Sequence, residues 1–172
     1  CHAVDMAPFY ARLPYRLTNA QQRSIREFID DMTGNGPHGA AAMHRILIGD
    51  VGSGKTICAM AAIYLAVKNG YQCALMAPTE ILASQHFQDM QSFFSALGIH
   101  VALLTGSTTV KEKRELCRQL ESGTDMCQVV IGTHALLENN IHFSNLGLTI
   151  TDEQHRFGIR QRTRLDEKSG HG

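Results

Sequence analysis

Residues 49–56 read Gly49-Asp50-Val51-Gly52-Ser53-Gly54-Lys55-Thr56 and fit the pattern Gly-x-x-x-x-Gly-Lys-[Ser/Thr]. The apolar run 46–48 precedes this stretch, and the helix-like run 57–67 follows it. Glycines let backbone N–H groups curl around the phosphates of a nucleotide, and the N-terminus of the following helix adds partial positive charge. The stretch therefore predicts a phosphate-binding loop between a strand and a helix.

Two side chains in this loop carry chemistry of their own. Lys55 is predicted to reach the β and γ phosphates of ATP, and Thr56 to offer its hydroxyl to Mg2+. The other predicted nucleotide contacts come from Gly49, Val51, Gly52, Ser53 and Gly54. The sequence thus predicts ATP and Mg2+ as cofactors, and a glycine-rich turn without a ligand is the alternative interpretation.

Composition limits the class of protein. The chain has 172 residues, 44% of them hydrophobic, which is enough for one compact domain with a core. Sixteen basic and sixteen acidic residues leave no net charge, so any contact with nucleic acid must be local. No apolar run reaches the roughly 18 residues of a membrane span, and the five cysteines include no Cys-x-x-Cys pair. These features favour a cytoplasmic protein with buried thiols, and the absence of an initial methionine favours a fragment.

Strand-like and helix-like runs alternate along the chain. Apolar, β-branched runs predict strands at 45–49, 73–77, 100–104, 128–132 and 146–151. Helical spacing predicts helices at 19–32, 54–69, 81–97 and 110–121. Thr18, Thr79 and Thr109 stand where helix caps are expected. Because the connections are long enough for crossovers, the sequence predicts an α/β fold with a mostly parallel central sheet and helices on both faces.

A second motif ends the last predicted strand. The run Leu148-Thr149-Ile150-Thr151 leads into two adjacent acids, Asp152 and Glu153. At a strand end, Asp152 is placed to support Mg2+ between the phosphates, and Glu153 to orient the water that attacks the γ phosphorus. An acidic turn that merely closes a strand is the alternative.

Several blocks together resemble a known family. Beside the phosphate-binding loop, the most specific block is Asp152-Glu153-Gln154-His155-Arg156-Phe157-Gly158. Further blocks stand at 13–21, 77–83, 104–107 and 132–136. Their order and spacing resemble the first motor domain of RecG-like ATP-dependent DNA helicases of superfamily 2, and the resemblance covers residues 13–164.

The resemblance implies both a fold and a set of site residues. It implies a RecA-like P-loop NTPase domain at 13–165, between an irregular entry segment at 1–12 and a truncated tail at 166–172. The implied catalytic residues are Lys55, Asp152, Glu153 and His155, and Gln21 is the implied adenine contact. The implied DNA contacts are Pro78, Thr79, Thr105, Gly106, Thr133 and His134.

Plainer interpretations exist for these implied contacts. Gln21 fits a capping box with Thr18, and the threonines that follow the strands fit helix caps and turns. His134 fits an ordinary loop histidine. The arginines between 156 and 164 fit a solvated surface.

The resemblance also implies an activity. The chain would bind and hydrolyse ATP in a monomeric DNA helicase or translocase acting on branched or fork DNA in recombination, repair and fork remodelling. It places the second RecA-like domain and an N-terminal wedge domain outside these residues, so we expect slow ATP hydrolysis by the chain alone. The alternatives are the motor domain of a transcription-repair coupling translocase and a non-catalytic nucleotide-binding interaction module.

Overall fold

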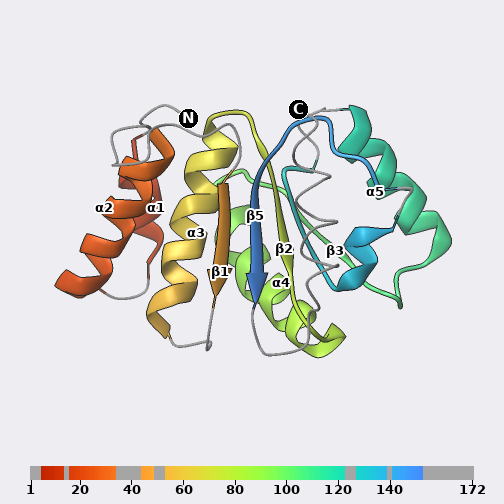
Figure 1. The fold of residues 1–172 in the computed structure, drawn as a ribbon, viewed down its shortest axis with the longest axis horizontal. Helices are drawn as coiled ribbons and strands as arrows, with labels where there is room; N and C mark the ends of the chain where they lie inside the picture. Colours follow the sequence, from red (N-terminus) through yellow and green to blue (C-terminus); the bar gives the residue numbers. More distant parts are fainter. Residues whose placement is uncertain are drawn as a thin grey trace.

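The computed structural model describes residues 5–13, 16–33, 44–48, 53–122, 127–138 and 141–152, with backbone only at 28, 31–33, 44–48 and 53–56. Within these residues lies a five-stranded sheet in which all pairings are parallel. Its strands are β1 His44–Ile48, β2 Gln72–Met76, β3 Val101–Leu104, β4 Val129–Gly132 and β5 Leu146–Asp152. They lie in the order β1-β5-β2-β4-β3, and Figure 1 labels β1, β5, β2 and β3 in this sequence from left to right. The predicted parallel sheet is confirmed.

Helices cover both faces of this sheet, as predicted. The four long helices are α2 Asn19–Thr33, α3 Ser53–Lys68, α4 Glu80–Ser95 and α5 Val110–Ser122. On β2, Cys73 and Leu75 belong to one core cluster with α3 and α4. Ala74 and Met76 belong to a second cluster with α5 and the short 3-10 helix η1 His134–Leu137. The alternation of side chains along each strand therefore separates the core into two layers.

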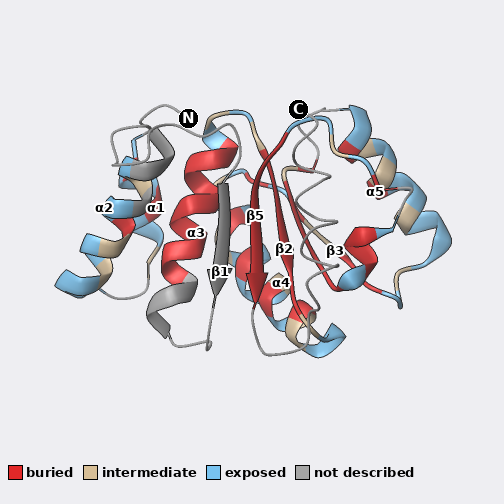
Figure 2. Ribbon diagram, in the orientation of Figure 1, coloured by how far each residue is buried: buried red, intermediate tan, exposed pale blue. Residues whose placement is uncertain are grey.

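Helix α3 lies in the middle of the first layer. All of its residues from 57 to 67 are buried, as its apolar sequence predicts. It lies between the sheet and α2, which is largely exposed on its outer side (Figure 2). Gly70, just beyond its end, has a φ of +87°, the left-handed conformation that allows the chain to leave the helix.

Two predicted capping boxes are present. The N–H of Thr18 donates to Oε1 of Gln21 at 2.9 Å, and the N–H of Gln21 donates to Oγ1 of Thr18 at 3.1 Å. Thr109 and Glu112 make the same reciprocal pair, with both bonds at 3.2 Å. These local bonds start α2 and α5 where the sequence predicts.

The entry segment differs from its prediction. Residues 1–12 were expected to be irregular, yet Ala7–Arg12 forms helix α1. Phe9 is its buried anchor, with ring centroids 5.8 Å from Tyr64 and 5.3 Å from Phe93. A six-residue helix has little stability of its own, so this contact with α3 and α4 explains why the sequence pattern did not reveal it.

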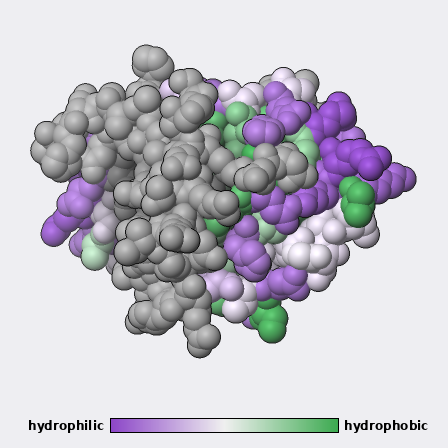
Figure 3. All heavy atoms as spheres, turned by 45° about the vertical axis from the view of Figure 1, so that its right-hand side comes forward, coloured by the Kyte–Doolittle hydropathy of each residue, from purple (hydrophilic) through white to green (hydrophobic). Residues whose placement is uncertain are grey.

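The coloured surface on the face drawn in Figure 3 is mainly polar. On the face shown in Figure 3, hydrophobic surface outside the grey atoms is confined to small, separate areas. The large hydrophobic residues exposed in the described part are Tyr10, Ile81 and Val110. No helix in that part is long and apolar enough to cross a membrane.

Candidate nucleotide and nucleic-acid site

The parallel strands bring the predicted site residues to one edge of the sheet. Ile48, the last residue of β1, pairs in register with Asp152, the last residue of β5. The chain then passes through 49–52 and enters α3 at Ser53. The start of the helix that carries Lys55 and Thr56 thus follows a strand whose end lies beside Asp152.

Asp152 points toward the layer that contains α3. Leu148 and Ile150 belong to the core cluster of α3 and α4, so alternation along β5 directs the side chain of Asp152 to the same face. A contact with His86 of α4 agrees with this direction. The carboxylate and the N-terminus of α3 therefore lie on one side of the sheet.

The carboxylate of Asp152 is fully buried, and one of its two oxygens has a hydrogen-bond partner among the described residues. Its Oδ2 lies 3.1 Å from Nε2 of His86, whose side chain is 8% exposed. Its Oδ1 has no hydrogen-bond partner in the part of the chain that the structure describes. An unpaired buried carboxylate oxygen is costly, and it is also the ligand type that a hard cation such as Mg2+ prefers. The residue therefore fits the predicted role in supporting Mg2+.

Sequence reasoning did not identify His86. It stands on the buried stripe of α4, with Ala83, Met90 and Phe94. The sequence does place a histidine within an apolar helical stripe. This position could have indicated a functional contact, because a buried polar side chain needs a hydrogen-bond partner. Nothing in the sequence named that partner, which lies on another element.

The candidate DNA contacts lie at the same ends of the strands, next to the ends of β1 and β5. Pro78 and Thr79 follow β2, and Thr133 and His134 follow β4. The loop of Thr105 and Gly106 follows β3. Since β2, β4 and β3 are neighbours in the sheet, these loops lie next to one another, as expected for ligand sites of open α/β sheets.

The threonine hydroxyls in these loops accept local hydrogen bonds. Oγ1 of Thr79 accepts from the N–H of Leu82 at 3.2 Å and caps α4. Oγ1 of Thr105 accepts from the N–H of Ser107 at 3.2 Å. Oγ1 of Thr133 accepts from Ala135 at 3.5 Å. The capping and turn interpretations are confirmed for these residues.

Exposure divides the candidate DNA contacts into two groups. Thr79, Gly106 and His134 are exposed, whereas Thr105 and Thr133 are buried. Thr105 and Thr133 accept hydrogen bonds from backbone N–H groups of their own loops and so stabilise the loop conformation. Direct contact with a DNA strand is therefore a prediction for the exposed residues and for the half-buried Pro78.

Hydrogen bonds and close backbone contacts join the loops to one another. The N–H of Thr133 donates to the carbonyl of Leu104 at 3.3 Å. A Cβ at Gly132 would lie 2.2 Å from that carbonyl oxygen, so this approach requires glycine. The loops after β3 and β4 thus begin in direct backbone contact.

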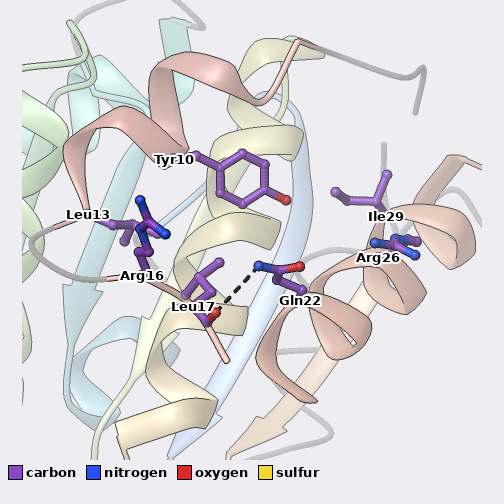
Figure 4. Close-up of a pocket in the computed structure, with 7 residues that line it drawn as sticks. All are labelled: Tyr10, Leu13, Arg16, Leu17, Gln22, Arg26 and Ile29. Atoms are coloured by element: carbon purple, nitrogen blue, oxygen red, sulfur yellow. Dashed lines mark hydrogen bonds between the residues drawn. The ribbon is translucent and has the colours of Figure 1, made fainter. Parts of the chain in front are cut away.

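A groove of about 850 Å³ adjoins the predicted adenine segment (Figure 4). It is lined by Tyr10, Leu13, Arg16, Leu17, Gln22, Arg26 and Ile29. Nε2 of Gln22 donates to the carbonyl of Leu17 at 3.4 Å. Burial raises the pKa of the Tyr10 hydroxyl, and the charge of Arg26 opposes this rise. Gln21 makes its cap beside this groove, and its contact with adenine stays a prediction.

Several predicted residues lie outside the described part. These are Gly49, Val51, Gly52, Glu153 and His155, together with the tail 166–172. Ser53, Gly54, Lys55 and Thr56 are placed at the start of α3 by their backbone alone. Their roles stay predictions from the sequence.

Comparison with protein families and curated proteins agrees with this geometry. The sequence matches the family model of the DEAD/DEAH box helicase over residues 18–169. It is 46% identical over 164 residues to the ATP-dependent DNA helicase RecG of Synechocystis sp. and 49% identical over 160 residues to that of Thermotoga maritima. These matches cover 95% and 93% of this chain but 19% and 20% of the relatives. The chain therefore spans about a fifth of the length of the curated relatives it matches.

Solved structures give the same result for the fold. RecG bound to a three-way DNA junction matches with a TM-score of 0.73 and 49% identity, over 87% of this chain and 20% of that chain. A hypothetical ATP-dependent RNA helicase from Sulfolobus tokodaii matches with a TM-score of 0.57 and 14% identity, over 94% of this chain and 53% of that chain. The second likeness concerns the fold alone. The predicted RecA-like P-loop NTPase fold is confirmed.

Proposed function

We propose, because this chain belongs to the DEAD/DEAH box helicase family, that it is the first motor unit of a RecG-like DNA helicase or translocase. The observation that carries the proposal is the register pairing of Ile48 with Asp152. It puts the end of β1, which the predicted phosphate-binding loop follows in the sequence, beside a buried carboxylate on the α3 side of the sheet. Cytoplasmic location and action as a monomer are part of the proposal.

The nucleotide is held at the N-terminus of α3. Backbone N–H groups of the loop and the ammonium of Lys55 bind the phosphates, while the helix dipole adds to the attraction. The hydroxyl of Thr56 and the carboxylate of Asp152 would hold Mg2+. When bound, Mg2+ neutralises charge that spreads over the phosphoryl oxygens during transfer.

Hydrolysis requires a water molecule in line with the γ phosphorus. Glu153 follows Asp152 directly in the sequence. Its proposed role is to orient the water molecule whose oxygen attacks the γ phosphorus. The family resemblance gives His155 the proposed role of linking ATP hydrolysis to DNA contact. The exposed groups of the loops after β2, β4 and β3 contact the DNA backbone, which positions a strand without reading its sequence.

Full activity depends on a second RecA-like domain. An arginine finger from that domain raises turnover by about 10^3 to 10^5 in related phosphoryl-transfer enzymes. We therefore expect the chain alone to bind Mg2+·ATP weakly and to hydrolyse it slowly. Branched or fork DNA is the proposed substrate of the whole protein, because the similar RecG structure is described as bound to a three-way DNA junction.

Equilibrium binding of a fluorescent, non-hydrolysable ATP analogue tests this function. The chain is expected to bind it in the presence of Mg2+, and Lys55→Ala to weaken binding at least about tenfold. Lys68→Ala, on the last turn of the same helix, is the matched control and should leave binding unchanged. The proposal fails if the parent does not bind or if both variants behave alike.

Adding the isolated second motor domain separates a motor from a non-catalytic module. Stimulated ATP hydrolysis is expected for the motor. Unchanged hydrolysis would favour the interaction module.

A further inference from the structure

We propose that His86 is a positioning residue of the cation site. Its Nε2–H holds Oδ2 of Asp152, and this bond presents Oδ1 to the Mg2+ of bound Mg2+·ATP. The inference rests on the proposed function, since it concerns the same site. It adds a residue of α4 to that site.

The direction of the hydrogen bond follows from the chemistry of the two groups. An ionised carboxylate has only acceptors, so Nε2 of His86 must carry the proton and donate it. The two atoms lie 3.1 Å apart, and Asp152 is fully buried. A donor at this distance removes part of the cost of burying the charge.

The bond also restricts how the carboxylate rotates. His86 is the hydrogen-bond partner of Asp152 in the described part of the chain, and the bond engages one oxygen only. With Oδ2 held, Oδ1 keeps one orientation, and no hydrogen-bond donor among the described residues occupies its lone pairs. Outer partners of this kind orient metal ligands, and their loss typically costs about 10- to 100-fold in metal affinity or activity.

Helix α4 is a rigid support for such a donor. Ala83, Met90 and Phe94, on the same stripe as His86, are each 1% exposed or less. Thr79 caps the start of the helix. His86 therefore belongs to the buried face of a well-packed helix, and its hydrogen bond joins Asp152 to that helix.

Four variants of the 172-residue chain separate positioning from packing. His86→Leu removes the donor and keeps an apolar side chain of moderate volume. His86→Gln keeps an N–H donor at a similar reach. His86→Leu combined with Asp152→Asn, compared with Asp152→Asn alone, asks whether His86 acts through the carboxylate.

The affinity for a fluorescent, non-hydrolysable ATP analogue is measured as a function of the Mg2+ concentration. The temperature is kept well below that of unfolding. For His86→Leu, half-saturating Mg2+ should rise about tenfold or more, while affinity in EDTA stays within about twofold of the parent. His86→Gln should lie within about threefold of the parent. In the Asp152→Asn background, His86→Leu should add less than about twofold.

Other outcomes overturn the inference. A rise below threefold for His86→Leu, equal impairment by His86→Gln, or a full effect of His86→Leu in the Asp152→Asn background would each do so. Thermal unfolding monitors folding, and His86→Asn, with its shorter amide, replaces His86→Leu if the latter does not fold. If the parent chain binds no nucleotide, the proposed function itself fails. If the parent binds normally and His86→Leu is unaffected, only the inference about His86 fails.

Discussion

Oγ of Ser107 donates a hydrogen bond to Oε2 of Glu80 at 3.0 Å, which ties the loop after β3 to the first turn of α4. Thr79, one residue earlier, is the cap of the same helix. Two candidate DNA loops are therefore joined through side chains as well as through the sheet. In the proposed function, these two loops would therefore meet a DNA strand as one surface.

Substitutions at Thr79 are expected to separate the helix cap from the DNA contact. Thr79→Ala should lower the free energy of unfolding by about 1 kcal/mol, because it removes the acceptor for the N–H of Leu82. Thr79→Asp should keep the cap and therefore the stability, since aspartate is a good N-cap. Its negative charge should nevertheless weaken binding to forked DNA about tenfold at low salt.

Urea unfolding and fluorescence anisotropy with labelled forked DNA check these two effects. Thr79→Ser is the control, because it retains the hydroxyl and should change neither quantity. Normal DNA binding by Thr79→Asp would exclude a phosphate contact at this loop.

Thr149→Val is expected to stabilise the chain by about 1 kcal/mol. Thr149 is fully buried on β5, and its Oγ1 has no hydrogen-bond partner in the described part of the structure. Valine keeps the branched shape without the desolvated hydroxyl. Thr105→Val should act in the opposite direction, because Oγ1 of Thr105 accepts from Ser107. If urea unfolding shows that both substitutions change the free energy of unfolding in the same direction, this interpretation is wrong.

Gly132→Ala should destabilise the chain by about 2 kcal/mol or more. The added Cβ would lie 2.2 Å from the carbonyl oxygen of Leu104, a backbone atom of the neighbouring strand. Gly106→Ala is the matched control, since its Cβ would lie 3.1 Å from the end of the flexible Glu80 side chain. Thermal unfolding should show a large loss for the first variant and little change for the second.

Alkaline pH should destabilise the folded chain through Cys127. Burial raises the pKa of this thiol from 9.0 to about 12, so the unfolded chain loses the proton before the folded chain does. Stability from this group should fall by up to about 1.4 kcal/mol per pH unit as pH rises through that window. Cys127→Ala should flatten the slope of unfolding free energy against pH between pH 9 and 11. An unchanged slope would show that the thiol does not contribute.

Local patterns in the sequence predict most of the fold. The strand starts and ends agree to within a residue or two with β1 to β5, and the boxes at Thr18 and Thr109 begin their helices as expected. Such features depend on neighbours a few residues away, so sequence spacing alone determines them. The glycine-rich pattern at 49–56 likewise indicates phosphate binding because its chemistry is contained in one short stretch.

Only the tertiary structure decided which distant groups meet. It brought His86 to Asp152 across 66 positions of sequence, placed β5 between β1 and β2, and docked α1 through Phe9. It also buried Thr105 and Thr133 while leaving Thr79 exposed. These outcomes depend on long-range packing and on strand order, which impose no regular spacing on the chain, and no pattern in the sequence could therefore express them.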